Sequence, residues 1–189
     1  INDISTYQTD KYWIAEGSKG LRSIQRKGSN SFEALNEPII LDGPYSNSAF
    51  DIVCKNDKVY MIIGGKDLLN GKRFDKGGYI LTYDYDKWSF IDPKEAQKKL
   101  NLPRNPRDYT SIAVTTDDSN DEIVYASSMG DGVIQYKNGT PVQSYNEKNA
   151  FKETAGGYGS GYCYIDGLAF DKNGNLWMTS SEVNHAVLV

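Results

Sequence analysis

Two short glycine-containing runs in this chain contain residue types that phosphate-binding, hydrolytic or calcium sites use. Residues 157–161 read Gly-Tyr-Gly-Ser-Gly. They have neither the Gly-Lys-Ser/Thr of a phosphate loop nor the Gly-x-Ser-x-Gly spacing of a hydrolase. The run 171–175 begins like a calcium loop, but it lacks a glycine at the required position. We interpret the first run as a flexible loop and the second as the turn of a β-hairpin.

Acidic, histidine and cysteine side chains could support acid–base, metal or nucleophilic chemistry. The acidic pairs 117–118 and 121–122 fall in an expected short turn, where solvated charge is the simplest interpretation. His185 is the single histidine, and neither Cys54 nor Cys163 is near it in sequence, so a zinc site or a Cys–His couple has little support. Two cysteines are too few for a disulfide framework, and we predict two buried thiols. We therefore expect a chain that is not an enzyme and has no cofactor and no metal site.

Basic and aromatic side chains gather in the three longest stretches between expected strands, 64–78, 92–110 and 146–164. Arginine can bind carboxylate or phosphate through two hydrogen bonds, and tyrosine can stack on a sugar ring while offering its hydroxyl. The candidate ligand-binding residues are Lys66, Lys72, Arg73, Arg104, Arg107, Tyr109, Tyr158, Tyr162 and Tyr164. A glycan or an acidic protein partner would suit this mixture. The alternative for each residue is solvated charge on a variable loop.

Composition excludes several classes of protein. The chain has 189 residues, a formal net charge of −4 and 12% aromatic residues, with 14 Tyr and 18 Gly. Abundant aromatics and glycines favour strands and tight turns, and an acidic balance argues against a nucleic-acid partner, which needs a basic face. No apolar run approaches the roughly 18 residues of a spanning helix, so we expect no membrane insertion by this segment. Both ends look cut from a longer chain, which would remove any targeting sequence.

An internal repeat organises the chain. Four segments each contain a short apolar strand, a polar turn and a strand led by an aromatic residue; they span 1–25, 49–84, 111–137 and 167–189. The equivalent aromatics are Trp13, Tyr60, Tyr125 and Trp177, which are 47, 65 and 52 residues apart in turn. A constant plan with uneven spacing indicates one supersecondary unit that carries variable loops. We expect these aromatics to pack between neighbouring units.

Further strands complete the unit. A glycine opens a third strand in the first three segments (Gly20, Gly78 and Gly132), and candidates for a fourth strand lie at 32–35, 88–91 and 141–145. Four antiparallel strands per roughly 40–50 residues is typical of a propeller blade. The sequence therefore predicts an all-β fold, a β-propeller segment of four-stranded antiparallel blades, three complete plus part of a fourth. The expected blades are 1–47, 48–109 with long loops, 110–165 and the start of another at 166–189.

Blade topology also predicts where the loops lie. Connections between strands one and two, and between three and four, share one side of a blade, and the other connections lie opposite. The three long stretches then fall on one face, which is the candidate binding surface. Within the second stretch, residues 93–102 are expected to form a short helix that Pro93 opens after Asp92 as cap.

Two stretches resemble known propeller families. Residues 167–181 (GLAFDKNGNLWMTSS) resemble two-component regulator propeller repeats in their apolar pair, Asp, Gly-Asn turn and Leu-Trp. Residues 123–150 resemble the propellers of PorZ-like proteins, which are associated with the type IX secretion system of Gram-negative bacteria. The matching positions are Ala126-Ser127-Ser128, Gly130, Gly132-Val133, Tyr136, Asn138-Gly139 and Tyr145-Asn146.

These resemblances imply a function without catalysis. The PorZ-like resemblance implies a periplasmic or cell-surface setting, a part in cargo modification and attachment, and recognition of a glycan or lipopolysaccharide. The first resemblance implies an alternative, the carbohydrate-sensing ectodomain of a hybrid two-component receptor acting in signal transduction. A third alternative, a propeller lyase or glycosidase, conflicts with a single His and the lack of clustered acids on the long loops. The expected partners are a glycan or protein on the long-loop face and the remaining blades of the parent propeller.

Overall fold

The computed structural model describes residues 3–15, 21–39, 43–46, 48–154 and 161–189. The chain divides into two compact units, Ile1–Gly43 and Pro44–Val189. Strands dominate both units, and no helix in the described part of the chain is long and apolar enough to cross a membrane.

The first unit is a single antiparallel sheet of four strands in sequence order. The strands are β1 (Asp3–Gln8), β2 (Lys11–Ala15), β3 (Leu21–Arg26) and β4 (Phe32–Ala34). Ile14 is the only buried apolar side chain among this unit's described residues. One sheet cannot bury its own two faces, as expected of a repeat that needs a neighbour.

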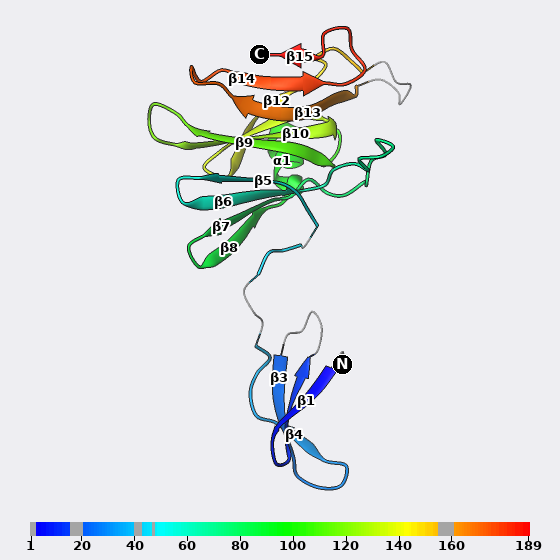
Figure 1. Cartoon of the computed structure of the whole chain (residues 1–189), viewed down its shortest axis with the longest axis vertical. Helices are drawn as coiled ribbons and strands as arrows, with labels where there is room; N and C mark the ends of the chain where they lie inside the picture. Colours follow the sequence, from blue (N-terminus) through cyan, green and yellow to red (C-terminus); the bar gives the residue numbers. More distant parts are fainter. Residues whose placement is uncertain (1–2, 16–20, 40–42, 47, 155–160) are drawn as a thin grey trace. The chain divides into compact units, whose positions relative to one another are not determined.

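The second unit contains three more sheets, which Figure 1 shows lying face to face. The first consists of β5 (Ala49–Lys55), β6 (Lys58–Ile63), β7 (Ile80–Asp84) and β8 (Lys87–Ile91). The second consists of β9 (Tyr109–Thr116), β10 (Glu122–Gly130), β11 (Gly132–Lys137) and β12 (Thr140–Tyr145). The third consists of β13 (Cys163–Phe170), β14 (Leu176–Ser180) and β15 (Val187–Leu188). The predicted fold class, a propeller segment with three four-stranded sheets and part of a fourth, is confirmed.

The inner strands hold these three sheets together. β9 contacts both β5 and β13. The end of β10 leaves its own sheet and pairs with β13, with Met129 opposite Tyr164 and Gly130 opposite Cys163. The last two sheets are therefore joined by backbone pairing as well as by side-chain packing.

Short turns follow from residues that accept positive φ. Asn138 and Gly139, between β11 and β12, have φ of 48° and 75°, which is the type I′ geometry that matches the twist of a hairpin. In the turn 171–175 only Gly174 has positive φ, because the Asp171 carboxylate holds the turn by accepting from the backbone N–H groups of Asn173 and Asn175. The predicted hairpin between β13 and β14 is confirmed.

The one helix in the described residues, α1 (Pro93–Leu100), begins as the sequence predicts. Asp92 accepts from the backbone N–H of Lys94 at 2.9 Å, and Pro93 occupies the first turn. The helix ends two residues earlier than expected, because Asn101 adopts a left-handed conformation with φ of 51°.

A hydrophobic core lies between the first two sheets of the second unit. It includes Tyr60, Ile62 and Ile80 on one side and Tyr109, Ile112, Val124 and Tyr136 on the other. The hydroxyls of Tyr109 and Tyr136 lie 2.6 Å apart, so one donates a hydrogen bond to the other inside the core.

The aromatic at the start of the second strand packs against the next sheet in two of the repeats. Tyr60 is fully buried and donates to Glu122 of β10 at 2.5 Å. Tyr125 meets Phe170 of β13 edge-on, with ring centroids 6.0 Å apart. Trp177 is 44% exposed, so its packing against a following blade stays a prediction. No described element covers that face of the last sheet, and the indole N–H donates to Asp171 instead.

The two cysteines differ. Both are free thiols; Cys163 is buried in β13, whereas Cys54 is exposed on β5. The prediction of two buried thiols is therefore wrong for Cys54, which lies on the face of β5 opposite Val53, a residue packed on the core. Burial raises the pKa of the Cys163 thiol to about 12.

We expect Cys163 to resist thiol reagents while the protein is folded. Only a thiolate reacts quickly, and a buried thiol with a raised pKa forms almost none near pH 8. In a Cys54→Ser variant, Ellman's reagent at pH 8 should release no thionitrobenzoate until urea unfolds the chain, and then one equivalent. Stoichiometric release from the folded variant within seconds would contradict the buried position of Cys163.

Candidate functional site

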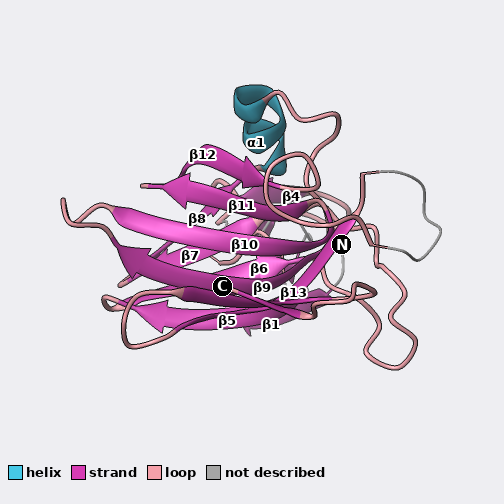
Figure 2. Cartoon of the chain, turned by 90° about the horizontal axis from the view of Figure 1, so that it is seen from above, coloured by secondary structure: helices cyan, strands magenta, loops and turns pink. Residues whose placement is uncertain are grey.

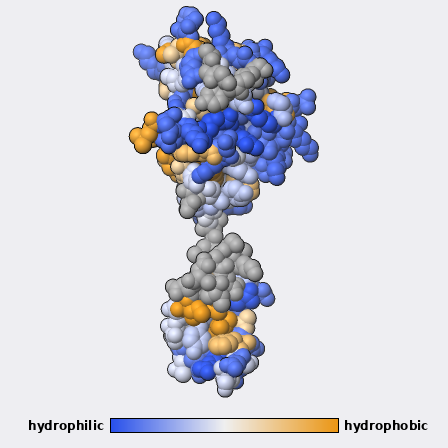
Figure 3. Space-filling model, turned by 90° about the vertical axis from the view of Figure 1, so that its right-hand side faces the viewer, coloured by the Kyte–Doolittle hydropathy of each residue, from blue (hydrophilic) through white to orange (hydrophobic). Residues whose placement is uncertain are grey.

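The three long connections lie at the same end of the second unit. They run from β6 to β7, from β8 to β9 and from β12 to β13, and they emerge on the right in Figure 1, opposite the short hairpin turns. Figure 3 views this side and shows hydrophilic residues over most of the described surface of the second unit. We call this surface, formed by residues 64–79, 92–108, 146–154 and 161–162, the long-loop face.

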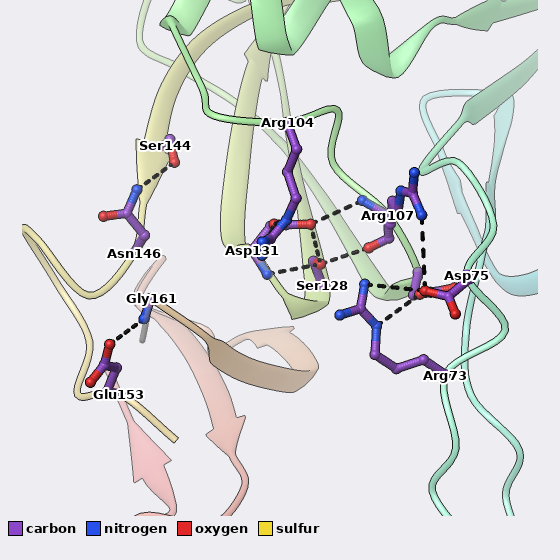
Figure 4. A network of polar contacts seen from close by, with 11 residues as sticks. Arg73, Asp75, Arg104, Arg107, Ser128, Asp131, Ser144, Asn146, Glu153 and Gly161 are labelled. Atoms are coloured by element: carbon purple, nitrogen blue, oxygen red, sulfur yellow. Dashed lines mark hydrogen bonds and ion pairs between the residues drawn. The ribbon is translucent and has the colours of Figure 1, made fainter. Parts of the chain in front are cut away.

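A buried carboxylate anchors the first of these loops. Asp108 is completely buried, and its two oxygens accept from the Arg73 Nε at 3.0 Å and from the backbone N–H of Lys76 at 2.9 Å. Burial by itself lowers the pKa of the Arg73 guanidinium, but the hydrogen bond and charge of Asp108 outweigh it, and the pKa is raised. Arg73 is therefore a fixed cation that holds loop 64–79 against the start of β9 (Figure 4).

A second carboxylate anchors the loop that follows α1. Asp131, between β10 and β11, accepts from the Arg104 Nε at 2.8 Å and from the backbone N–H of Arg107 at 3.0 Å. Ser128 donates to the Arg107 carbonyl at 2.7 Å and accepts from the Asp131 N–H at 3.1 Å. Figure 4 shows these groups converging on one turn. The long loops are thus tied to the strands below them, as a preorganised surface requires.

Tyr162 lies beside both arginines. The Arg104 guanidinium carbon is 4.6 Å from the ring centroid and that of Arg73 is 5.7 Å from it, distances at which cations are attracted to an aromatic face. Gly130 leaves room for the ring, because a Cβ at this position would lie 2.8 Å from Tyr162. The structure therefore brings Arg73, Arg104 and Tyr162 into one cluster.

The other candidate residues differ in their surroundings. Lys66 forms an ion pair with Asp166 of β13, and Arg107, 4.0 Å from Asp75, is half exposed. Tyr164 and Tyr109 are buried, Tyr109 completely, so its placement on the binding surface is corrected: it fills the core and pairs with Tyr136, out of reach of a ligand. Lys72 is exposed and has no ion pair with a described residue. Tyr158 lies outside the described residues.

A hollow of about 660 Å³ opens on this face. Its polar lining includes Asn70, Lys72, Asp75, Ser181 and Glu182, and Met129 and Tyr164 contribute an apolar side. The acidic partners of the cations, together with Ser181 and Glu182, were missed by the sequence analysis. The sequence held one indication of these acids. Many basic residues were expected on one surface, and partly buried cations need negative partners nearby.

Asp75, Asp108, Asp131 and Asp166 pair with Lys66, Arg73, Arg104 and Arg107, the cations nearest the hollow apart from Lys72 and Lys76. The hollow therefore offers donors and acceptors rather than a strong cationic field. Such an arrangement suits hydroxyl-rich ligands better than polyanions.

Comparison with known proteins shows the fold. A solved structure of PorZ, an essential bacterial surface component of the type-IX secretion system of Porphyromonas gingivalis, matches with a TM-score of 0.60 and 24% identity. The match covers 99% of this chain and 24% of PorZ, so the chain spans about a quarter of that protein. No protein-family model and no curated protein matches.

Two further solved structures match only loosely. The endo-arabinase of Bacteroides thetaiotaomicron has a TM-score of 0.36 and 12% identity over 97% of this chain and 70% of its own. A Saccharomyces cerevisiae complex of Dbp5, Nup159 and Gle1 has a TM-score of 0.35 and 8% identity over 95% of this chain and 62% of its own. The resemblance to two-component regulator repeats stays a prediction. What the chain shares with PorZ is the fold, that of a β-propeller segment.

Proposed function

We propose that this chain is a non-enzymatic recognition module, part of the β-propeller of a periplasmic or cell-surface protein, and that its long-loop face binds a glycan. The likeness in fold to PorZ supports the setting, because PorZ is a bacterial surface component of the type-IX secretion system. In that setting the module contributes to the assembly of a secretion component, and a lipopolysaccharide sugar is the natural ligand to test.

One observation carries the proposal: two of the three cations that line the hollow of about 660 Å³ are already paired with carboxylates. Arg73 and Lys66 are held by Asp108 and Asp166, so they supply fixed geometry rather than free charge. Lys72 remains to meet one acidic group of a ligand, while Asn70 and Ser181 can exchange hydrogen bonds with hydroxyls. A sugar chain with few charges fits this lining.

Replacing Lys72 with alanine should weaken glycan binding about tenfold, because a hydrogen bond to a charged group contributes about 1.5–3 kcal/mol. The fold should not change, because Lys72 contacts Asp67 and Asn70 through its backbone alone. Lipopolysaccharide core oligosaccharides would be screened as an array and the best titrated by calorimetry. Arg104 and Tyr109 are unsuitable for this test, since both stabilise the fold.

The matched control is Asp118→Ala, an exposed charge in the turn between β9 and β10, at the opposite end of the strands. It should bind like the parent chain. Equal affinity of the Lys72→Ala chain and the parent for every glycan that binds would contradict the proposal, and so would an array without any binder. The alternative, a receptor ectodomain, predicts the same binding but also a ligand-dependent signal from the full-length protein.

A further inference from the structure

The sheets β5–β8 and β9–β12 contact each other through β5, β6 and β9, which leaves a wedge between their outer strands. At the long-loop end α1 fills this wedge: Ala96 is fully buried, and Leu100 and Leu102 pack against the core. Figure 2 shows α1 beside β12 at this edge. At the end with the short turns a hollow of about 630 Å³ remains. This volume is within the range of about 300–1,000 Å³ that is typical of small-molecule sites.

Three polar side chains form one side of this hollow. Tyr60 donates to Glu122 Oε2 at 2.5 Å, and the Lys58 ammonium lies 3.3 Å from the same oxygen. Burial and the hydrogen bond to Glu122 raise the pKa of Tyr60, so its hydroxyl remains a donor at any physiological pH. Glu122 is 22% exposed, and its Oε1 accepts no hydrogen bond from a described residue. Glu122 lines the hollow, and its carboxylate thus has acceptor capacity to spare there.

The remaining walls are rich in hydroxyls and amides. Thr82 and Ser89, whose hydroxyls lie 2.5 Å apart, line the side of β7 and β8, and Thr116 and Thr140 line the other sheet. Asn56 and Asn120 come from the turns at the rim. Hydroxyls and amides donate and accept equally well, which is the chemistry that sugar hydroxyls require.

The charged residues of the hollow restrict the class of ligand further. Lys58 and Glu122 are its only charged lining residues, and they pair with each other. Asp84, 3.6 Å from the Lys58 ammonium, adds a second negative group nearby. An anionic ligand would therefore find no unpaired cation, and an apolar ligand would strand the hydroxyls without partners.

We infer that the hollow between β8 and β12 is a second binding site, independent of the long-loop face, for a small uncharged saccharide of one or two rings. The hydroxyls of the saccharide donate to Glu122 Oε1 and exchange hydrogen bonds with Thr82, Ser89 and Thr140. The site lies at the opposite end of the strands from the long loops, so both sites can be occupied at once.

The test uses the full chain and saturation-transfer NMR with glucose, galactose, maltose and lactose, and with glucuronate and glucose 6-phosphate as charged counterparts. At least one neutral sugar should bind, and its charged counterpart should bind at least tenfold more weakly. Ser89→Tyr, which fills the hollow, should reduce binding at least tenfold. Ser119→Tyr makes the same chemical change in the exposed turn between β9 and β10, outside the hollow, and should leave binding unchanged.

Two more variants keep the result interpretable. Thr140→Val preserves volume and removes one hydroxyl, so it should weaken binding severalfold even if Ser89→Tyr fails to fold. Lys72→Ala on the long-loop face should not alter the affinity for the neutral sugar, which separates this site from the one proposed above. Absence of binding by every neutral sugar, equal loss in both tyrosine variants, or loss in Lys72→Ala alone would each overturn the inference.

Discussion

Gly132→Ala is expected to lower the free energy of unfolding of the second unit by more than about 3 kcal/mol, a loss that few single substitutions cause. Gly132 opens β11 with φ of 74°, and an added Cβ would lie 2.0 Å from the Tyr145 carbonyl oxygen. That oxygen belongs to the backbone paired with β11, because Tyr145 is opposite Val133. The overlap can be relieved only by opening the β11–β12 pair.

Gly174→Ala is the matched control for this variant. Gly174 also has positive φ, 86°, but nothing lies within 4 Å of the added Cβ. It should therefore show the backbone strain alone, about 1–2 kcal/mol. Urea unfolding of both variants, followed by tryptophan fluorescence, measures the difference. Equal losses would show that the approach of Tyr145 is not what requires glycine at position 132.

Asp108→Asn is the second large effect, with an expected loss of about 2–3 kcal/mol. Asparagine still fits the φ of 49° and can still accept from the Lys76 N–H, so the change removes chiefly the negative charge beside Arg73. The guanidinium then remains mostly buried without its counter-charge. Such a loss is larger than that of a surface pair, because water cannot replace the missing partner.

Asp75→Asn is the matched control for Asp108→Asn. Asp75 also has positive φ, 56°, and also faces Arg73, at 3.9 Å, but its side chain is 71% exposed. We expect a change below about 1 kcal/mol, as for other exposed ion pairs. Urea unfolding of Asp108→Asn and Asp75→Asn in parallel tests the ranking. A cost for Asp75→Asn as large as that for Asp108→Asn would refute the anchoring role of Asp108.

Local signals in the sequence predicted most of the strands. Hairpins depend on residues that are neighbours in the chain, as in the type I′ turn at Asn138-Gly139 and the cap formed by Asp92 before Pro93. The repeat of these local units was enough to identify a propeller segment, because a four-stranded sheet with two apolar faces has few other ways to bury them.

The candidate site depended on pairings that no local signal contains. Arg73 and Asp108 are 35 residues apart, and Lys66 and Asp166 are 100 residues apart. Tyr109 looked like a loop tyrosine, but it begins β9 and points into the core. The burial of Cys54 was misjudged because alternation along a strand says which residues share a face and not whether another sheet covers that face.

The pairing of β10 with β13 affects how tension travels through the second unit. Two neighbouring sheets that met only through side chains could slide or separate without any main-chain hydrogen bond breaking. Here the link at Met129–Tyr164 and Gly130–Cys163 makes the peptide backbone itself the bridge. A pull on β14 or β15 is then transmitted along a continuous ladder to β12, and the two sheets resist it as one mechanical element.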